Sequence, residues 1–191
     1  MEIQAMLNNL LISENVVENI KENLDDLIQI IPEIKDMIGF ESKHPHHYLD
    51  VWEHTLYALS LSPNNFDIRL ALLLHDIGKP HSYQEGEVRH FKGHPEKSKD
   101  ISQLILRRFG YEEKYINYIC EIISRHDIPL TKNDIFTNEE KSKMIFEVQK
   151  CDAMAHNPDK NKKRIEYIAM INEIFNEKEK NNENFSLVQI R

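Results

Sequence analysis

Residues 71–80 read ALLLHDIGKP, and this stretch decides the fold. The apolar residues that lead into it fall on every side of a helix, which places that helix at the centre of the molecule. It carries His75 and Asp76 in its last turn, and we expect it to close at Gly78, before Pro80. Buried polar groups of this kind cost free energy unless a partner offsets their desolvation. The stretch therefore predicts a central helix with a charged partner beside its end.

Helical patterns continue on both sides of this stretch. Asp50, with Glu53 three positions later, predicts a helix that starts there and runs to about Leu61. Pro95 opens another helix, which Gly110 ends. Three- and four-residue spacings of apolar side chains indicate four more helices: from Ser13 as N-cap to Pro32, over 116–125, from Glu139 to Asn157, and from Lys162 to Phe175 before a frayed run 176–184.

The fold class that we predict is all-α, a helical bundle of a single domain. Turn chemistry at Glu85-Gly86 also allows one short β-hairpin within 82–91. A length of 191 residues suits one domain, and 5 glycines leave little room for a glycine-lined phosphate loop.

The net charge and the cysteines indicate which binding partners and which cellular compartment to expect. The chain has 24 Lys+Arg against 32 Asp+Glu, a net charge of −8, which argues against extended nucleic-acid binding. Cys120 and Cys151 lie in apolar helical patterns, so we expect reduced core thiols and a cytoplasmic protein. We find no 18-residue apolar run and no secretory signal at the N-terminus, so we expect no membrane partner.

Histidine and aspartate supply the candidate chemistry. Most of the 10 histidines fall between His44 and His126. Imidazole and carboxylate suit borderline divalent metals, and one carboxylate can bridge two ions about 3.5–4 Å apart. The candidate metal ligands are His54, His75, Asp76, His94, His126 and Asp152.

Each ligand candidate also fits an ordinary structural role. His54 suits a hydrogen-bonded core histidine, and Asp152 suits a helix cap or a lysine partner. His94, which precedes Pro95, suits a neighbour of the N-cap. The joint pattern favours a metal, because one ion offsets the desolvation of several buried groups at once.

The order of these residues resembles the HD superfamily of metal-dependent phosphohydrolases. Five segments are similar to the HD domain attached to bacterial tRNA nucleotidyltransferases: 50–56 (DVWEHTL), 71–80, 90–95 (HFKGHP), 125–126 and 152–158 (DAMAHNP). The resemblance covers roughly residues 44–158. Residues 1–43 are too few for a nucleotidyltransferase domain, so we expect no addition of nucleotides to tRNA.

The resemblance implies an organisation and a ligand set. It gives an N-terminal helical extension packed on the core (1–43), an HD domain (44–160) and a C-terminal helix and tail (161–191). His54, His75, Asp76 and Asp152 match the ligands of a first metal. His94 and His126 match those of a second ion that shares Asp76. The cofactor is then one or two divalent ions of manganese, iron, cobalt, nickel, zinc or magnesium, with the identity open.

Other polar residues have candidate roles around such a site. Lys79 matches the lysine of the HD-x-x-K variant and is suited to catalysis together with Asp76, or to binding phosphate; a surface lysine at a helix end is the alternative. Arg125 and His156 are candidate substrate contacts, although a surface arginine and a helix-end histidine are equally ordinary. His44, His46 and His47 suit the pocket rim, and we assign no role to His81 or His90.

We therefore expect a metal-dependent phosphohydrolase. Its substrate is a small phosphomonoester or phosphodiester, a nucleotide or a 2′,3′-cyclic nucleotide, cleaved by metal-activated water. Two alternatives remain open: a di-iron oxygenase on the same scaffold, and a non-catalytic metal-containing module that binds nucleotides. The N-terminal helices are available either to cover the core or to form a homodimer.

Overall fold

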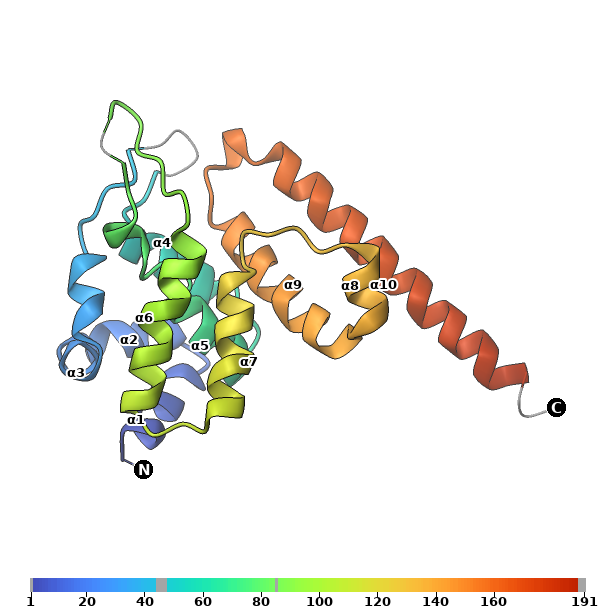
Figure 1. Ribbon diagram of the computed structural model, residues 1–191, viewed down its shortest axis with the longest axis horizontal. Coiled ribbons are helices and arrows are strands. Elements are labelled where there is room, and N and C mark those ends of the chain that lie inside the picture. Colours follow the sequence, from blue (N-terminus) through green and yellow to red (C-terminus); the bar gives the residue numbers. More distant parts are fainter. Residues whose placement is uncertain (1, 44–47, 85, 189–191) are drawn as a thin grey trace.

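The computed structural model describes residues 2–43, 48–84 and 86–188, and side chains as far as residue 180. These residues form ten α-helices and no β-strand, which confirms the all-α fold class. Figure 1 shows the helices packed side by side, with α10 extending beyond the rest. Their bounds are α1 Glu2–Leu11, α2 Val16–Glu22, α3 Leu24–Ile30, α4 Val51–Ser60, α5 Phe66–Leu74, α6 His94–Arg108, α7 Glu113–Ser124, α8 Lys132–Thr137, α9 Glu139–Met154 and α10 Lys162–Val188.

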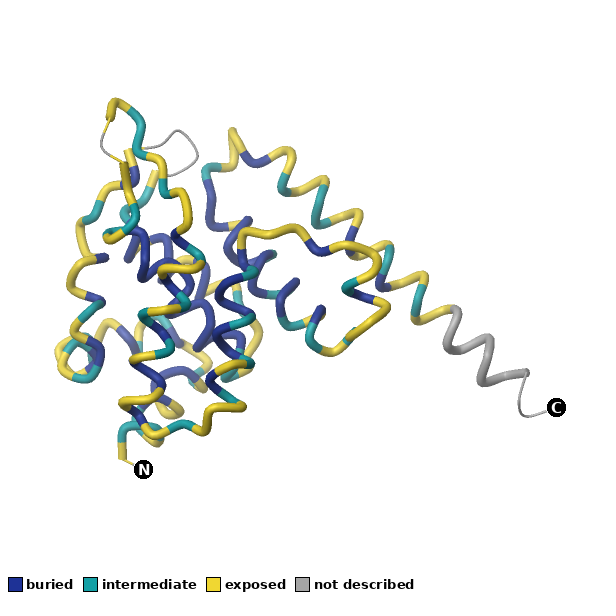
Figure 2. The backbone as a smooth tube through the Cα atoms, in the orientation of Figure 1, coloured by how far each residue is buried: buried dark blue, intermediate teal, exposed yellow. Residues whose placement is uncertain are grey.

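Helix α5 lies at the centre, as its apolar sequence predicts. Every residue from Leu70 to Leu74 is fully buried, and α1, α4, α7 and α9 pack around the helix. The helix starts at Asn65, whose side-chain oxygen accepts a hydrogen bond from the backbone N–H of Ile68 at 3.1 Å. Figure 2 shows the buried segments gathered in this region. One apolar core extends from Leu7 in α1 to Phe175 in α10.

Helices α4 and α6 begin and end close to where the sequence predicts. Asp50 caps α4, because its carboxylate accepts a hydrogen bond from the backbone N–H of Glu53 at 2.7 Å. Pro95 lies in the first turn of α6, and Gly110 follows this helix with a φ of +75°, a left-handed conformation that glycine adopts readily. These boundaries fix the positions at which α4 and α6 approach the end of α5.

Two predicted boundaries differ from the structure. The helix expected behind Ser13 is divided into α2 and α3 at Asn23, whose φ of −112° and ψ of 24° depart from helical values and whose side chain donates to the carbonyl of Asn19 at 2.8 Å. The residue before α2 is Asn15, whose side chain makes no capping bond. Two short or terminal helices, α1 and α8, have no counterpart among the predicted elements.

The C-terminal helix is longer than predicted. The run 176–184 is part of α10 rather than a frayed end. Its lysine Lys178 donates to the carbonyl of Ile135 at 2.9 Å and pairs with Glu139 at 3.0 Å, which ties the helix to α8 and α9. The hairpin allowed within 82–91 is reduced to one antiparallel bridge between Gln84 and His90.

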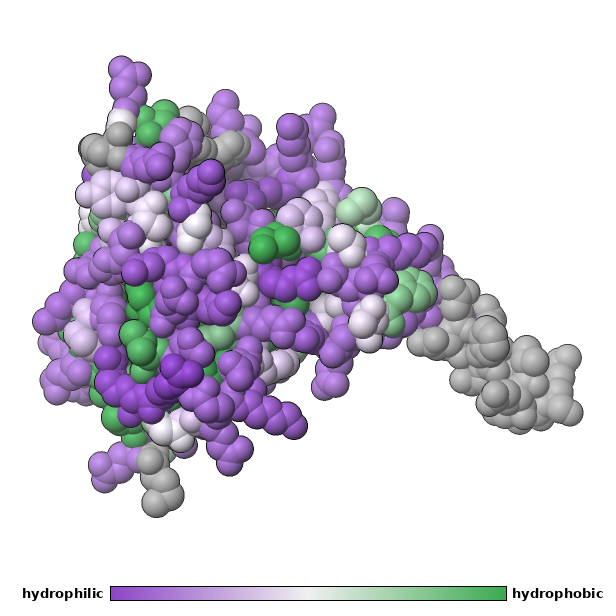
Figure 3. Space-filling model, viewed as in Figure 1, coloured by the Kyte–Doolittle hydropathy of each residue, from purple (hydrophilic) through white to green (hydrophobic). Residues whose placement is uncertain are grey.

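Two other expectations concern thiols and membranes. Cys120 and Cys151 are free and buried, and burial raises their pKa values to about 11 and about 12. Within the described residues, none of the helices combines the length and the apolar character needed to span a bilayer. The face drawn in Figure 3 carries mostly hydrophilic residues, with small, separate apolar spots.

Candidate metal centre

The chain leaves the helical path at the end of α5, and this turn directs two adjacent side chains to one place. The helix ends at Leu74, four residues before the predicted terminator Gly78, and His75 is its C-cap. Both His75 and Asp76 are fully buried. Successive residues of an undistorted helix point about 100° apart, so the end of the helix is what allows these two to converge.

Gly78 brings a second helix to the same place. Its backbone N–H donates to the Ser98 hydroxyl at 2.9 Å. A Cβ atom at this position would lie 2.4 Å from the Ser98 backbone nitrogen and 2.8 Å from the His94 carbonyl oxygen. The φ of Gly78 is −84°, so the requirement for glycine comes from this close approach and not from a left-handed turn. The contact places His94, the first residue of α6, beside Asp76.

Four predicted ligands form the first group, from α4, the end of α5 and α9. One ligand atom from each of His54, His75, Asp76 and Asp152 lies within 4.8 Å of the others. His54 Nε2 is 2.8 Å from Asp152 Oδ1 and 3.7 Å from Asp76 Oδ2. His75 Nε2 is 3.3 Å from Asp76 Oδ2 and 3.5 Å from Asp152 Oδ1.

The second group uses the other oxygen of Asp76. His94 Nε2 lies 3.3 Å and His126 Nε2 lies 3.7 Å from Asp76 Oδ1, and the two nitrogens are 3.0 Å apart. All three residues are buried and lie within the same 4.8 Å limit. The six residues thus form two adjoining groups, and the Asp76 carboxylate belongs to both.

Backbone carbonyls orient the imidazoles. The Nδ1 atoms of His75, His94 and His126 lie 2.7, 2.9 and 2.7 Å from the carbonyl oxygens of Leu72, Phe91 and Ile123. A neutral imidazole that donates from Nδ1 keeps the lone pair of Nε2 for another partner. These Nε2 atoms all point at the Asp76 carboxylate, which is the orientation that a metal ligand needs.

The charges of the site fit a cation. Burial lowers the pKa of His75, but the carboxylates of Asp76 and Asp152 raise it by more, to about 10. Burial and the neighbouring His75 lower the pKa of His126 to about 3. Among the described residues, His75 Nε2 and Asp76 Oδ1 are buried and lack a hydrogen-bond partner. Nitrogen and oxygen donors of this set can hold a divalent metal of borderline softness.

Lys79 lies in the site and not on the surface. Its side chain is buried, and its ammonium group donates to Asp76 Oδ2 at 2.5 Å. The Phe91 ring lies on its other side, 5.8 Å from ring centroid to Nζ. Despite burial, His75 and Lys79 hold the pKa of Asp76 well below its usual value. The alternative of an exposed helix-end lysine is therefore wrong for Lys79.

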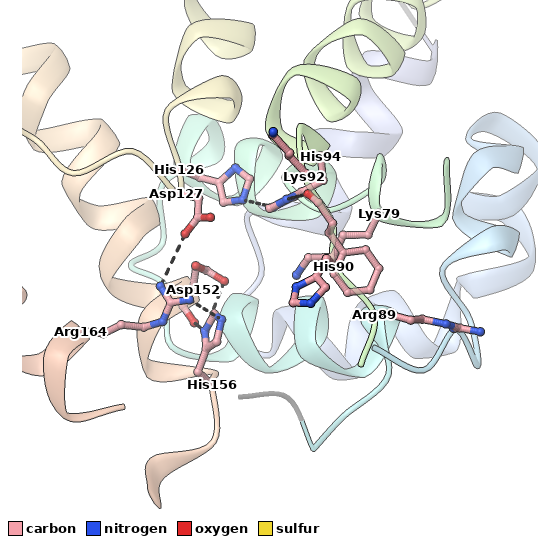
Figure 4. Close-up of a pocket in the computed structure, with 11 residues that line it drawn as sticks. Lys79, Arg89, His90, Lys92, His94, His126, Asp127, Asp152, His156 and Arg164 are labelled. Carbon is pink, nitrogen blue, oxygen red and sulfur yellow. Dashed lines mark hydrogen bonds and ion pairs between the residues drawn. The ribbon is translucent and has the colours of Figure 1, made fainter. Parts of the chain in front are cut away.

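A cavity of about 310 Å³ opens over the two groups. Figure 4 shows Arg164, Asp127 and His156 on one side of it, and Lys79 and His90 on the other. Its lining includes four cationic side chains: Lys79, Arg89, Lys92 and Arg164. Of these, only Lys79 was predicted from the sequence to have a role. No role was predicted for Arg164. The only signal for one was its position after two lysines at the start of the predicted last helix, which forms a cluster of positive charge.

The two remaining substrate candidates lie in different surroundings. His156 lines the cavity, its Nδ1 is 2.7 Å from the carbonyl oxygen of Asp152, and burial lowers its pKa to about 4. Arg125 does not line the cavity; its guanidinium donates to Asp134 at 2.9 Å. The structure thus brings His156 to the pocket and directs Arg125 to a neighbouring carboxylate.

The other histidines are dispersed. His90 lines the cavity, whereas His81 pairs with Asp36 at 3.4 Å on the surface. The suggested rim residues, His44, His46 and His47, lie outside the described residues.

Comparison with known proteins agrees with this geometry. An alignment of 104 positions, which covers 50% of this chain, is 33% identical to a CC-adding tRNA nucleotidyltransferase of Thermus thermophilus. It covers 24% of that relative, so this chain spans about a quarter of the length of the curated protein it matches. Residues 46–154 match the HD domain family, and this range contains all six residues of the two groups. The chain belongs to the HD domain family.

Proposed function

We propose that this protein is a metal-dependent phosphohydrolase that cleaves a small phosphomonoester or phosphodiester, such as a nucleotide or a 2′,3′-cyclic nucleotide. The observation that carries the proposal is the division of the Asp76 carboxylate between two buried groups of imidazoles and carboxylates. Phosphoryl-transfer sites that use two metals place the ions about 3.5–4 Å apart, a spacing that one bridging carboxylate provides. Membership of the HD domain family, whose members are generally metal-dependent hydrolases, supports the same chemistry.

Each ligand residue has a defined part in this proposal. His54, His75, Asp76 and Asp152 hold one divalent ion, and His94 and His126 hold a second ion with the shared Asp76. When bound, such ions supply Lewis acidity and lower the pKa of a coordinated water. The carbonyls that accept from Nδ1 of His75, His94 and His126 keep the Nε2 atoms of these rings turned toward the Asp76 carboxylate, where they would be available to hold an ion.

The cationic side chains of the pocket hold the substrate phosphate. Lys79 reaches the site from the end of α5, and Arg164 reaches it from α10. An ammonium and a guanidinium group at these positions neutralise the charge spread over the phosphoryl oxygens during hydrolysis. With Nδ1 directed at the Asp152 carbonyl, His156 keeps Nε2 as an acceptor for the Arg164 guanidinium, 3.2 Å away, and so positions this arginine at the pocket.

The charge of the chain and its similarity to a nucleotidyltransferase both favour a small nucleotide over other phosphate esters. The chain carries a net charge of −8, which repels a long polyanion, while the local pocket is cationic. The matched relative is a CC-adding tRNA nucleotidyltransferase, and its name supports a nucleotide as the substrate class.

Elemental analysis followed by a substrate screen tests this proposal. The protein is purified, its metal is identified, and phosphomonoesters and cyclic nucleotides are assayed with that metal. We expect metal-dependent release of phosphate, or opening of a cyclic diester, in the wild-type protein. In Asp76→Ala we expect loss of both the activity and the bound metal with the helical circular-dichroism signal retained, because the apolar helices do not depend on this carboxylate.

Three outcomes contradict the proposal. The first is full hydrolysis by Asp76→Ala with unchanged metal content. The second is oxygen consumption that depends on ferrous iron, which indicates a di-iron oxygenase. The third is a tight nucleotide complex without product after hours of incubation, which indicates a binding module.

A further inference from the structure

A second cavity adjoins the metal pocket. It has a volume of about 200 Å³ and lies between α9, α10 and the loop after α7. The two cavities share His126, Asp127, Asp152 and Arg164 in their linings. A ligand whose phosphate lies over the metal ligands can therefore extend its remaining part into the second cavity.

The polar groups around the second cavity are already paired with one another. The Tyr167 hydroxyl accepts a hydrogen bond from the Leu130 backbone N–H at 2.8 Å and donates to Gln149 Oε1 at 2.6 Å. Gln149 Nε2 donates to the carbonyls of Arg125 and Ile128 at 2.8 and 2.6 Å. These bonds fix the Tyr167 ring and leave its apolar surface for contact.

The rest of the lining has two apolar residues, carries the cationic side chain of Lys163, and is charged at the junction with the metal pocket. Pro129 and Ala153 contribute side chains without polar groups. At the junction, the Arg164 guanidinium lies 3.2 Å from His156 Nε2 and 3.6 Å from Asp127 Oδ1, as Figure 4 shows. An oxyanion entering from the metal pocket therefore meets a cation, and the group attached to it meets an apolar wall.

We propose that this cavity binds the leaving group of the phosphate ester and that it selects a planar aromatic group, such as a nucleobase, by contact with Tyr167. The inference rests on the proposed function, which it deepens by assigning the cavity and the residue that select the group attached to the phosphate. An aromatic side chain that stacks on a base raises the affinity for it by roughly 5- to 150-fold. Tyr167 and Arg164 lie on α10, beyond residues 46–154, so this specificity comes from a part of the chain outside the family match.

Two matched ligand pairs test the inference. Adenosine 5′-monophosphate and ribose 5-phosphate share the ester and differ in the base, and their kcat/KM values are compared with the metal-loaded protein. Adenosine and ribose carry no cleavable phosphate, and their binding is followed by saturation-transfer NMR. We expect the wild-type protein to prefer the nucleotide by about tenfold or more and to bind adenosine but not ribose.

Two substitutions at Tyr167 separate the ring from the hydroxyl. Tyr167→Phe keeps the ring and removes the bonds to Leu130 and Gln149, so we expect the preference for the base to remain. Tyr167→Leu removes the ring, and we expect the preference to fall to less than about threefold through a higher KM for the nucleotide.

The outcomes distinguish this inference from the proposed function. Equal kcat/KM values for the two esters in the wild-type protein, or an undiminished preference in Tyr167→Leu, contradict the leaving-group cavity while the hydrolase remains. Adenosine binding that depends on the Tyr167 ring, without hydrolysis of any ester, supports the cavity and contradicts the proposed function.

Discussion

The apolar and polar parts of the buried interior meet on one short segment of chain. Leu70–Leu74 and His75–Asp76 are equally buried, yet they contribute to the protein in opposite ways. Burial of each leucine stabilises the fold by about 1.5–3 kcal/mol, whereas the buried imidazole and carboxylate carry a desolvation cost. The comparison indicates that the apolar part holds the helices together, and that the polar part supplies a set of donors that could hold a cation.

The largest expected effect follows from removing the charge of Asp76 while keeping its size. In Asp76→Asn we expect kcat/KM to fall at least about a thousandfold, because both ligand groups lose their shared carboxylate. The unfolding temperature of this variant no longer responds to a chelator. If Asp76→Asn keeps its activity and its response to a chelator, the buried polar residues do not hold a metal that hydrolysis requires.

The matched change in the apolar half is Leu73→Ala. Leu73 is fully buried one turn before the site, and its truncation costs about 3–4 kcal/mol of unfolding free energy. We expect the metal content per folded chain and kcat to remain near wild type, measured by denaturant unfolding and by assays below the unfolding transition. Loss of metal without loss of stability is the opposite result and shows that the two halves are not separate.

Metal removal isolates the contribution of the cation. At a free metal concentration of about 100 times Kd, binding stabilises the fold by about 2.7 kcal/mol, so a chelator lowers the unfolding temperature. The effect is smaller in variants that lack His75 or Asp152, because these keep the second group of Asp76, His94 and His126. An unfolding temperature that a chelator leaves unchanged in the wild-type protein contradicts the account of the polar cluster.

Gly78→Ala tests the packing that joins the two halves. An added Cβ meets the backbone of His94 and Ser98, so the start of α6 has to move. We expect a loss of about 2 kcal/mol in stability together with weaker binding of the ion at His94 and His126. Ser98→Ala is a control that removes one hydrogen bond without adding bulk, and it has the smaller effect on metal binding.

The smallest effect on stability is expected for Arg125→Ala, because Arg125 lies outside both the apolar core and the polar cluster. Bonds from Arg125 and Thr131 hold the pKa of Asp134 below its usual 3.8, so this stabilisation is complete at neutral pH and is lost as the pH falls below that value. The ion pair is partly exposed, and Arg125→Ala costs less than about 1 kcal/mol at pH 7. Unfolding curves at pH 7 and pH 3 check this, with a smaller difference between variant and wild type at pH 3. A large loss of activity in Arg125→Ala would contradict this assignment and would show that Arg125 contacts the substrate.

Local sequence signals predicted the central helix and the convergence of the six ligand candidates. The uninterrupted apolar run marks α5, and helix caps such as Asp50 mark its neighbours. The position of Asn23 illustrates the limit, because the same apolar spacing continues through the break, where the backbone of Asn23 departs from helical dihedral angles. Gly78 was predicted to end a helix, but its close approach to α6 depends on tertiary packing.

The lining of the pocket was harder to predict than its centre. Arg125 and Arg164 are both arginines near predicted helix ends, and the sequence does not show which one reaches the site. Asp134 holds Arg125, while Arg164 extends from α10 to His156. This choice depends on how α8 and α10 pack, which local patterns do not encode.

Metal stoichiometry tests the central claim most directly. Metal-free protein is loaded with a divalent ion, freed of excess, and measured by elemental analysis for the wild type, His126→Ala and Asp76→Ala. The account predicts two ions per wild-type chain, one in His126→Ala and none in Asp76→Ala. A wild-type chain that binds no ion, or a His126→Ala chain that keeps both, contradicts it.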